Sequence, residues 1–220
     1  MIVISGYFGK ELTGVYTALQ DIKCFFFSNN GEMKSIVEDL GWIFIYIPMP
    51  LSADPRISSL QSKYVKFLQF DSKKIGLESG QSILYFDHKI EVNKEHAQKL
   101  EKLCSKEILI CNTPKEKLTI QDEINSALPQ KRYAEVMQET IMWVNNKIES
   151  EGYSEFNRIM STGLIFYKEI ETIQMLCDEV YETCWLIGQP ECQIIWGILS
   201  QRYEKIIRRI EWSDIDVVRR

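Results

Sequence analysis

The sequence lacks the short motifs by which many nucleotide-binding and hydrolytic enzymes are identified. It contains no G-x-x-x-x-G-K-[ST] string, so a phosphate-cradling P-loop is not expected. Gly6 and Gly9 alone do not make the G-x-G-x-x-G fingerprint of dinucleotide-binding proteins. A G-x-S-x-G elbow is also missing, which disfavours an α/β-hydrolase. The chemistry must therefore be argued from where single residues fall in the fold.

Histidine is scarce, and the cysteines are not spaced for metal binding. His88 and His96 are the only two histidines, which nearly excludes a histidine-based metal site. The six cysteines contain no C-x-x-C pair, and most of them sit in apolar surroundings. We expect reduced cysteines in the core of a protein from a cytosol-like compartment, rather than disulfides or zinc ligands.

The chain also lacks an excess of positive charge and a long apolar run. Its formal net charge is -5, whereas a dedicated nucleic-acid binder usually carries a basic stripe, so no nucleic-acid partner is expected. No apolar stretch reaches the roughly 18 residues that a membrane span needs. The stretch Met1–Gly6 has neither the basic start nor the cleavage site of a secretory signal. We expect a cytoplasmic protein without a membrane span.

What is present is an alternation of short apolar runs with helical patterns, in a chain of 220 residues that is 45% hydrophobic. The expected strands are 2–7, 24–27, 42–47, 83–86, 107–111 and 163–167. The expected helices are 15–19, 33–40, 57–68, 95–104, a short one within 113–130, 131–149, 173–187 and one from about 191. This order predicts an α/β fold, a mainly parallel sheet flanked by helices. We expect one Rossmann-like domain over residues 1–212, followed by a tail or linker at 213–220.

Asp87 is the residue whose position in the sequence most clearly suggests a chemical role. Ile83–Phe86 is a run of four apolar residues, which is typical of a strand buried on both faces. Ligands of open α/β sheets collect at the carboxyl ends of the strands, where Asp87 falls. The carboxylate could bind a hard divalent cation that in turn holds a diphosphate. It could equally cap the turn that follows the strand.

Other polar residues end the expected strands or lie on the expected helices. The strand ends carry Ser5, Tyr7, Ser28, Asn29 and Asn30. Arg56 and Lys63 are seven residues apart, nearly on one line of a helix, where they could meet a phosphate or be ordinary surface charges. Glu191 follows Gly188-Gln189-Pro190 at the start of a helix. A carboxylate there could complement the helix dipole or act as a general base.

Taken in order, these pieces resemble a small glycosyltransferase of the GT-A fold. Such compact enzymes occur in large DNA viruses that infect algae, and similar domains occur in bacteria and plants. The resemblance covers about residues 2–205. It rests on Gly6-Tyr7-Phe8-Gly9, Phe27-Ser28-Asn29-Asn30, Asp54-Pro55-Arg56 with Lys63, the strand from Ile83 to Asp87, and Glu191-Cys192-Gln193.

The resemblance implies an enzyme that transfers a hexosyl or deoxyhexosyl group from a nucleotide sugar, expected to be a UDP-sugar. The acceptor would be a glycan or another hydroxyl compound. Asp87 would bind Mn²⁺ or Mg²⁺ against the diphosphate, a Lewis-acid role in catalysis, and Glu191 would be the base of an inverting enzyme. The donor would be bound by Ser5, Gly6, Tyr7, Phe8, Asn29, Asn30, Arg56 and Lys63.

The sequence departs from the family pattern at one important place. The usual Asp-x-Asp is Asp87-His88-Lys89 here. One carboxylate can still anchor a hydrated ion, or Lys89 can replace part of the metal's charge, so metal dependence stays open. An alternative that also stays open is a catalytically silent GT-A-like domain, which binds a nucleotide sugar or glycan without turnover. A sugar-phosphate nucleotidyltransferase is disfavoured, because no Gly-rich loop with Arg or Lys follows the first strand.

The resemblance also bears on location and on the extent of the chain. If the protein is viral, its compartment would be the cytoplasm of the host. The abrupt end at Arg219-Arg220 is compatible with further domains in a longer chain.

Overall fold

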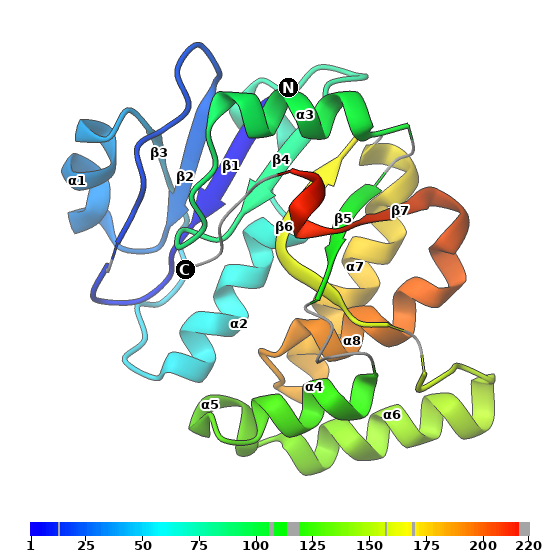
Figure 1. Ribbon diagram of the computed structural model, residues 1–220. Helices are drawn as coiled ribbons and strands as arrows, with labels where there is room; N and C mark the ends of the chain where they lie inside the picture. The colour runs from blue at the N-terminus through cyan, green and yellow to red at the C-terminus, as the bar shows by residue number, and fades with distance from the viewer. Residues whose placement is uncertain (13, 106–107, 114–118, 157, 169, 216–220) are drawn as a thin grey trace.

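The computed structural model describes residues 1–220 except 13, 106–107, 114–118, 157, 169 and 216–220. Its strands are β1 (Ile2–Gly6), β2 (Cys24–Ser28), β3 (Ile43–Tyr46), β4 (Ile83–Phe86), β5 (Ile108–Asn112), β6 (Met160–Tyr167) and β7 (Ile207–Ile210). They form one seven-stranded sheet in the order β3-β2-β1-β4-β6-β5-β7, which runs through the middle of the molecule (Figure 1).

The helices surround this sheet. They are α1 (Lys34–Asp39), α2 (Pro55–Lys66), α3 (Lys94–Leu103), α4 (Ile120–Ala127), α5 (Lys131–Ala134), α6 (Met137–Glu151), α7 (Ile170–Ile187) and α8 (Cys192–Leu199). Short 3₁₀ turns are η1 (Gly31–Met33), η2 (Ser72–Ile75), η3 (Ser200–Ile206) and η4 (Trp212–Asp214). In Figure 1, α3 lies along the top of the view, α4, α5 and α6 gather at the bottom, and α2 passes below β1 and β4.

The pairing of the strands confirms an α/β fold with a mainly parallel sheet. β1 pairs in parallel with β2 and β4, β2 pairs in parallel with β3, and β5 pairs in parallel with β7. β6 is the exception, because it runs antiparallel to both of its neighbours, β4 and β5. The edge strand β7 is the strand that the sequence prediction missed. Its sequence, Ile-Arg-Arg-Ile, is neither an apolar run nor an alternation of apolar and polar residues.

Successive strand residues enter two separate cores, one on each face of the sheet. Ile4 belongs to the core that also contains Leu60 of α2, whereas its neighbour Val3 belongs to the core that contains Leu100 of α3. This alternation follows from the two-residue period of a strand. Because helices cover both faces of the sheet, the strand residues on both faces are apolar, and the strands are continuous hydrophobic runs in the sequence.

Two expected helices differ from the observed structure. The segment 15–19 has no regular secondary structure. Its backbone groups form hydrogen bonds with the segment after α1, since Ala18 N donates to Leu40 O and Tyr16 O accepts from Trp42 Nε1. Tertiary hydrogen bonds here override the local helical pattern. The helix expected at 131–149 is divided into α5 and α6, with a break at 135–136.

Several general expectations can be compared with the structure. All six cysteines are buried and free, as predicted. No described helix is both long and apolar enough to cross a membrane. The tail expected at 213–220 is described only as far as Ile215, whose side chain is fully buried. Residues 216–220 lie outside the described part of the chain.

Candidate functional site

A cavity of about 680 Å³ opens at the carboxyl ends of β1 and β4, and we call it the β1–β4 cavity. Its walls come from the loop after β1, from α2, from the turn after β4 and from the segment that leads into α8. Small-molecule sites occupy roughly 300–1,000 Å³ and lie at such strand ends in open α/β sheets. The size and the position therefore suit an organic ligand.

Asp87 lies in this cavity with two side-chain partners. Tyr85 and Asp87 are two residues apart, so their side chains leave the chain on the same face. Tyr85 Oη donates to Asp87 Oδ1 at 2.5 Å, and Lys66 Nζ lies 3.2 Å from the same oxygen. The backbone N–H of Asp87 donates to Gly163 O in β6 at 2.8 Å. Among the described residues, no backbone N–H of the following turn donates to this carboxylate, so the capping alternative is not observed.

The three groups hold one another in defined protonation states. Burial disfavours the Lys66 ammonium, but Asp87 together with the nearby Cys192 and Glu191 outweighs this effect, and the pKa of Lys66 is raised. Burial alone would raise the pKa of Asp87, yet Lys66 and the Tyr85 hydroxyl lower it below its ordinary value. Burial and the nearby carboxylate raise the pKa of Tyr85. At neutral pH the site thus holds an ammonium, a carboxylate and a neutral phenol.

Lys63 brings a second ammonium to the cavity. It lies three residues before Lys66 on α2, so both side chains leave the same side of the helix. Lys63 is only 7% exposed and lines the cavity. Within the described residues it has no hydrogen-bond or ion-pair partner, unlike Lys66. An ammonium of this kind is an available site for an anionic ligand.

The charge of the cavity is opposite in sign to that of the whole chain. Its basic residues are Lys10, Lys63, Lys66, Lys89 and Arg132, and its acidic residues are Glu11, Asp87 and Glu191. The chain as a whole carries a formal charge of -5. A concave surface with an excess of positive charge concentrates anions.

Hydroxyl groups line the α2 side of the cavity. Ser58, Ser59 and Ser62 lie on α2, and Ser52 precedes the helix. Arg132 Nη1 donates to Ser59 Oγ at 3.3 Å, which links this wall to α5. A serine hydroxyl can both donate and accept, which suits a ligand rich in hydroxyl groups.

Glu191 and Tyr133 form the opposite side. Glu191 is the N-cap of α8, and its Oε1 accepts from Gln193 N at 3.3 Å. Burial and the carboxylate of Glu191 together raise the pKa of Tyr133. Both residues line the cavity. Glu191 therefore caps a helix and faces the cavity at the same time.

Four of the eight residues expected to bind the donor line the cavity, namely Gly6, Tyr7, Phe8 and Lys63. A Cβ at Gly6 would lie 2.8 Å from Phe27 O, so the close approach of β1 and β2 requires glycine here. The Tyr7 ring meets the His88 ring edge-on, with 5.0 Å between their centroids.

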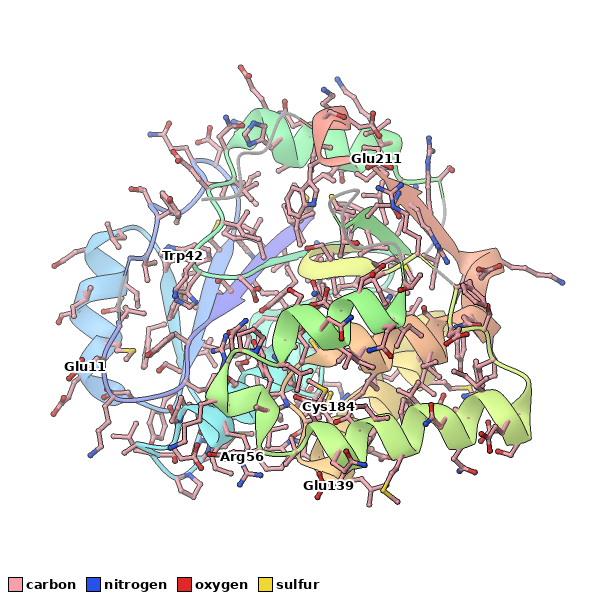
Figure 2. All side chains as sticks on the ribbon, turned by 60° about the horizontal axis from the view of Figure 1, so that its bottom comes forward. Glu11, Trp42, Arg56, Glu139, Cys184 and Glu211 are labelled. Atoms are coloured by element: carbon pink, nitrogen blue, oxygen red, sulfur yellow. The ribbon has the colours of Figure 1, made fainter. Side chains whose placement is uncertain are left out.

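Ser5 and Arg56 lie outside the lining of the cavity. Ser5 Oγ donates to Phe86 O at 2.8 Å and so ties β1 to β4 beneath it. Arg56 Nε lies 3.8 Å from Glu135 Oε2, and Figure 2 labels Arg56 where α2 meets the segment between α5 and α6. Both side chains serve contacts between elements that form the cavity.

Asn29 and Asn30 also lie behind the cavity rather than on its surface. Asn29 Oδ1 accepts from Gly9 N at 3.2 Å, and its Nδ2 donates to Gln61 Oε1 at 3.2 Å. Asn30 Nδ2 donates to Lys10 O at 3.0 Å. The two amides thus hold the loop after β1 in the position where it forms a wall.

The donor groups around Asp87 do not suit a resident divalent cation. Mg²⁺ and Mn²⁺ take oxygen ligands, but Asp87 Oδ1 is already shared by an ammonium and a phenol. The second acidic position of the expected pair is Lys89. The described residues contain no group of three or more His, Cys, Asp or Glu side chains that could hold a metal ion. Metal binding at Asp87 stays a prediction.

Two cavity residues were missed by reasoning from the sequence, although each carried a signal. Lys66 follows Lys63 by three residues, the spacing that puts both on one side of a helix. Tyr85 precedes Asp87 by two residues, the spacing that puts both on one face of a strand. The partners Arg132 and Tyr133 carried no such signal, because only the tertiary fold brings α5 to α2.

Comparisons with known proteins leave the site to be interpreted from its geometry. No model of a known protein family matches the chain, and no curated protein matches it in sequence.

Proposed function

We propose that this protein is a glycosyltransferase with a GT-A-like domain. It would transfer a sugar from a nucleotide-diphosphate sugar to a hydroxyl group of a glycan or similar acceptor. The observation that carries the proposal is the β1–β4 cavity, with two buried ammonium groups at the carboxyl ends of parallel strands. The order of sequence pieces that resembles GT-A enzymes supports the same conclusion.

The chemistry of the cavity walls supports a nucleotide sugar as the ligand. Lys63 and Lys66 supply positive charge for a diphosphate. The serine hydroxyls of α2 can bond to hydroxyl groups of a sugar or ribose. Tyr7, in the loop after β1, offers aromatic surface, which suits the face of a base. The volume of about 680 Å³ accommodates a ligand of this size.

A transfer at this site has a consistent balance of bonds and protons. The acceptor oxygen forms a bond to the anomeric carbon while the bond from that carbon to the diphosphate oxygen breaks. The electron pair of the broken bond stays on the diphosphate, where Lys63 and Lys66 stabilise the negative charge. The acceptor's proton goes to the Glu191 carboxylate, which acts as the general base of an inverting reaction.

The proposal is tested by incubating the protein with a panel of UDP-, GDP-, CDP-, TDP- and ADP-sugars. We expect the nucleotide sugars of one base to raise the melting temperature of the protein, because a ligand that binds the native state stabilises it by mass action. The matching nucleotide sugar should then be hydrolysed slowly, and faster with an acceptor, as measured by released nucleoside diphosphate. Glu191→Gln should bind the nucleotide but lose at least about 100-fold in transfer.

The other outcomes are equally informative. If the panel neither stabilises the protein nor is cleaved, the proposed function is wrong. Stabilisation without any cleavage would instead identify a silent domain that binds nucleotide sugars. Asn145→Gln, an exposed amide on α6, is the matched control for Glu191→Gln and should behave as the parent protein.

A further inference from the structure

We propose that Lys66 takes the place of a divalent cation in this site, so that the diphosphate is bound without metal. The inference rests on the proposed function and specifies which group balances the negative charge of the donor's diphosphate. It starts from the contacts of Asp87, the residue at which a glycosyltransferase of this kind is expected to hold its metal ion.

The position next to Asp87 Oδ1 is already filled by a cationic group. Lys66 Nζ lies 3.2 Å from this oxygen, while a Mg²⁺ ion would bind such an oxygen at about 2.1 Å. Tyr85 Oη donates to the same atom at 2.5 Å. A divalent ion at Oδ1 would therefore displace the phenol and lie within a few ångströms of an ammonium, and like charges at that range repel strongly.

Lys66 is also held in place from several directions. Its side chain is 6% exposed, and its Nζ lies 5.4 Å from the centroid of the Tyr85 ring. The backbone carbonyl of Lys66 accepts from Tyr167 Oη at 2.7 Å. A buried ammonium that is paired with Asp87 and attached to an anchored backbone has little room to swing aside for an ion.

The surrounding charges favour the same assignment. Lys63 lies near Lys66 on α2 with no partner among the described residues, and Lys89 stands where a second metal-binding carboxylate was expected. These three ammonium groups line one cavity. Asp87 then acts as a positioning residue, because its carboxylate keeps Lys66 charged and oriented toward the ligand.

The test is the affinity of nucleoside diphosphates, UDP first and then GDP, CDP, TDP and ADP. It is measured by calorimetry in EDTA and again in Mn²⁺. We expect one of them to bind in EDTA, with an affinity within about threefold of that in Mn²⁺. Binding that requires Mn²⁺ contradicts the inference but leaves the proposed function intact. Absence of binding in both solutions contradicts the proposed function as well.

Two variants separate the roles of Lys66 and Asp87. Lys66→Met should weaken binding in EDTA at least about 10-fold. Asp87→Asn should change it by less than about threefold, because the loss of a negative charge next to the anion offsets the weaker positioning of Lys66. A metal-holding Asp87 instead predicts a loss of at least about 10-fold in Mn²⁺. That loss would overturn the inference.

Controls make the variants interpretable. Lys74→Met alters an exposed lysine of η2 outside the cavity and should bind as the parent does. Circular dichroism and melting temperature show whether Lys66→Met folds. If it does not, Asp87→Asn decides the question, since an amide has the shape of a carboxylate and can still accept from Tyr85.

Discussion

The ends of β2 and β4 are alike in sequence, but their polar residues have different roles in the structure. Both strands are apolar and both run into polar residues, Asn29 and Asn30 after β2 and Asp87 after β4. At β2 the amides hydrogen-bond to the protein's own loops and are less than 6% exposed. At β4 the carboxylate is shared by Lys66 and Tyr85 at the surface of a cavity.

This difference shows that a polar residue at a strand end is not by itself a binding residue. The β2 end is a scaffold, because its polar atoms are satisfied by neighbouring backbone and side chains. The β4 end is a candidate site, because it combines buried charge with open space. Substitutions at the β2 end should therefore act on stability first, and substitutions around the β4 end on binding first.

The largest effect is expected at the scaffold. Asn29→Ala removes the acceptor of Gly9 N and two donor contacts, to Gln61 and to Pro50 O. Buried groups left without partners cost about 1–3 kcal/mol each, so the free energy of unfolding should fall by about 2–4 kcal/mol in urea titrations. The exposed Asn145→Ala serves as the control and should change it by less than about 0.5 kcal/mol. A stable Asn29→Ala protein that merely binds less ligand would place Asn29 in the site instead.

A smaller loss is expected at Tyr85, which stands between scaffold and site. Tyr85→Phe keeps the packing but removes the hydrogen bond to the Asp87 carboxylate. Bonds to charged groups contribute about 1.5–3 kcal/mol, and part of this is recovered by the remaining pair with Lys66. We expect a loss of about 1–2 kcal/mol in unfolding free energy and a higher pKa for Asp87, read by carboxyl NMR titration. An unchanged pKa of Asp87 would show that the hydroxyl does not stabilise this charge.

Lys63 should behave in the opposite way from Asn29. Lys63→Met replaces a nearly buried lysine, which has no hydrogen-bond or ion-pair partner in the described part of the chain, by an apolar side chain of similar length, which relieves desolvation. The melting temperature should stay the same or rise, while the affinity for a nucleoside diphosphate falls about 10-fold, or about 1.4 kcal/mol. Calorimetry and thermal unfolding measure the two quantities on the same samples. A lower melting temperature with unchanged affinity would assign Lys63 to the scaffold instead of the binding site.

The smallest effect concerns pH and the turn after β4. Burial lowers the pKa of His88 to about 4; Asp87 opposes this shift, and Lys89 and Lys66 add to it. The ring meets Tyr7, whose own pKa is raised by burial and Glu11. Because the unfolded chain protonates His88 near pH 6.5, stability should fall as pH drops from about 6.5 to about 4.

The magnitude of this loss is about 1 kcal/mol, since His88 is partly exposed and solvent screens its charge. His88→Gln should flatten the slope of unfolding free energy in that pH interval and leave it unchanged above pH 7. Urea titrations at several pH values measure the slope. His96→Gln, on the other histidine, is the matched control. An identical slope in parent and His88→Gln would mean that the ring titrates as it does in water.

Much of the fold was predictable from local pattern, because strands buried on both faces and capped helices have short-range signals. Asp54 and Pro55 are typical of the start of a helix and indicate α2, and the apolar run 83–86 indicates β4. β7 was not predictable, since its pairing with β5 spans about a hundred residues of chain. The same limit applies to the site. Asp87 could be found from its strand, whereas its pairing with Lys66 and the distance of Arg56 from the cavity depend on how α2 packs.

The reversed direction of β6 has a consequence for how the β1–β4 cavity can adapt. Parallel strands contribute their ends and the loops beyond them, but β6 contributes Thr162 and Gly163 from its interior. The register between β5 and β6 shifts beside these two residues, and Gly163 O accepts a hydrogen bond from the backbone N–H of Asp87. This contact between two backbones fixes the floor of the cavity at Gly163, where a Cβ would press on Asp87 Oδ2 at 3.2 Å. Changes in ligand preference among variants should come from the rim, where backbone can be lengthened or reshaped, while the depth stays constant.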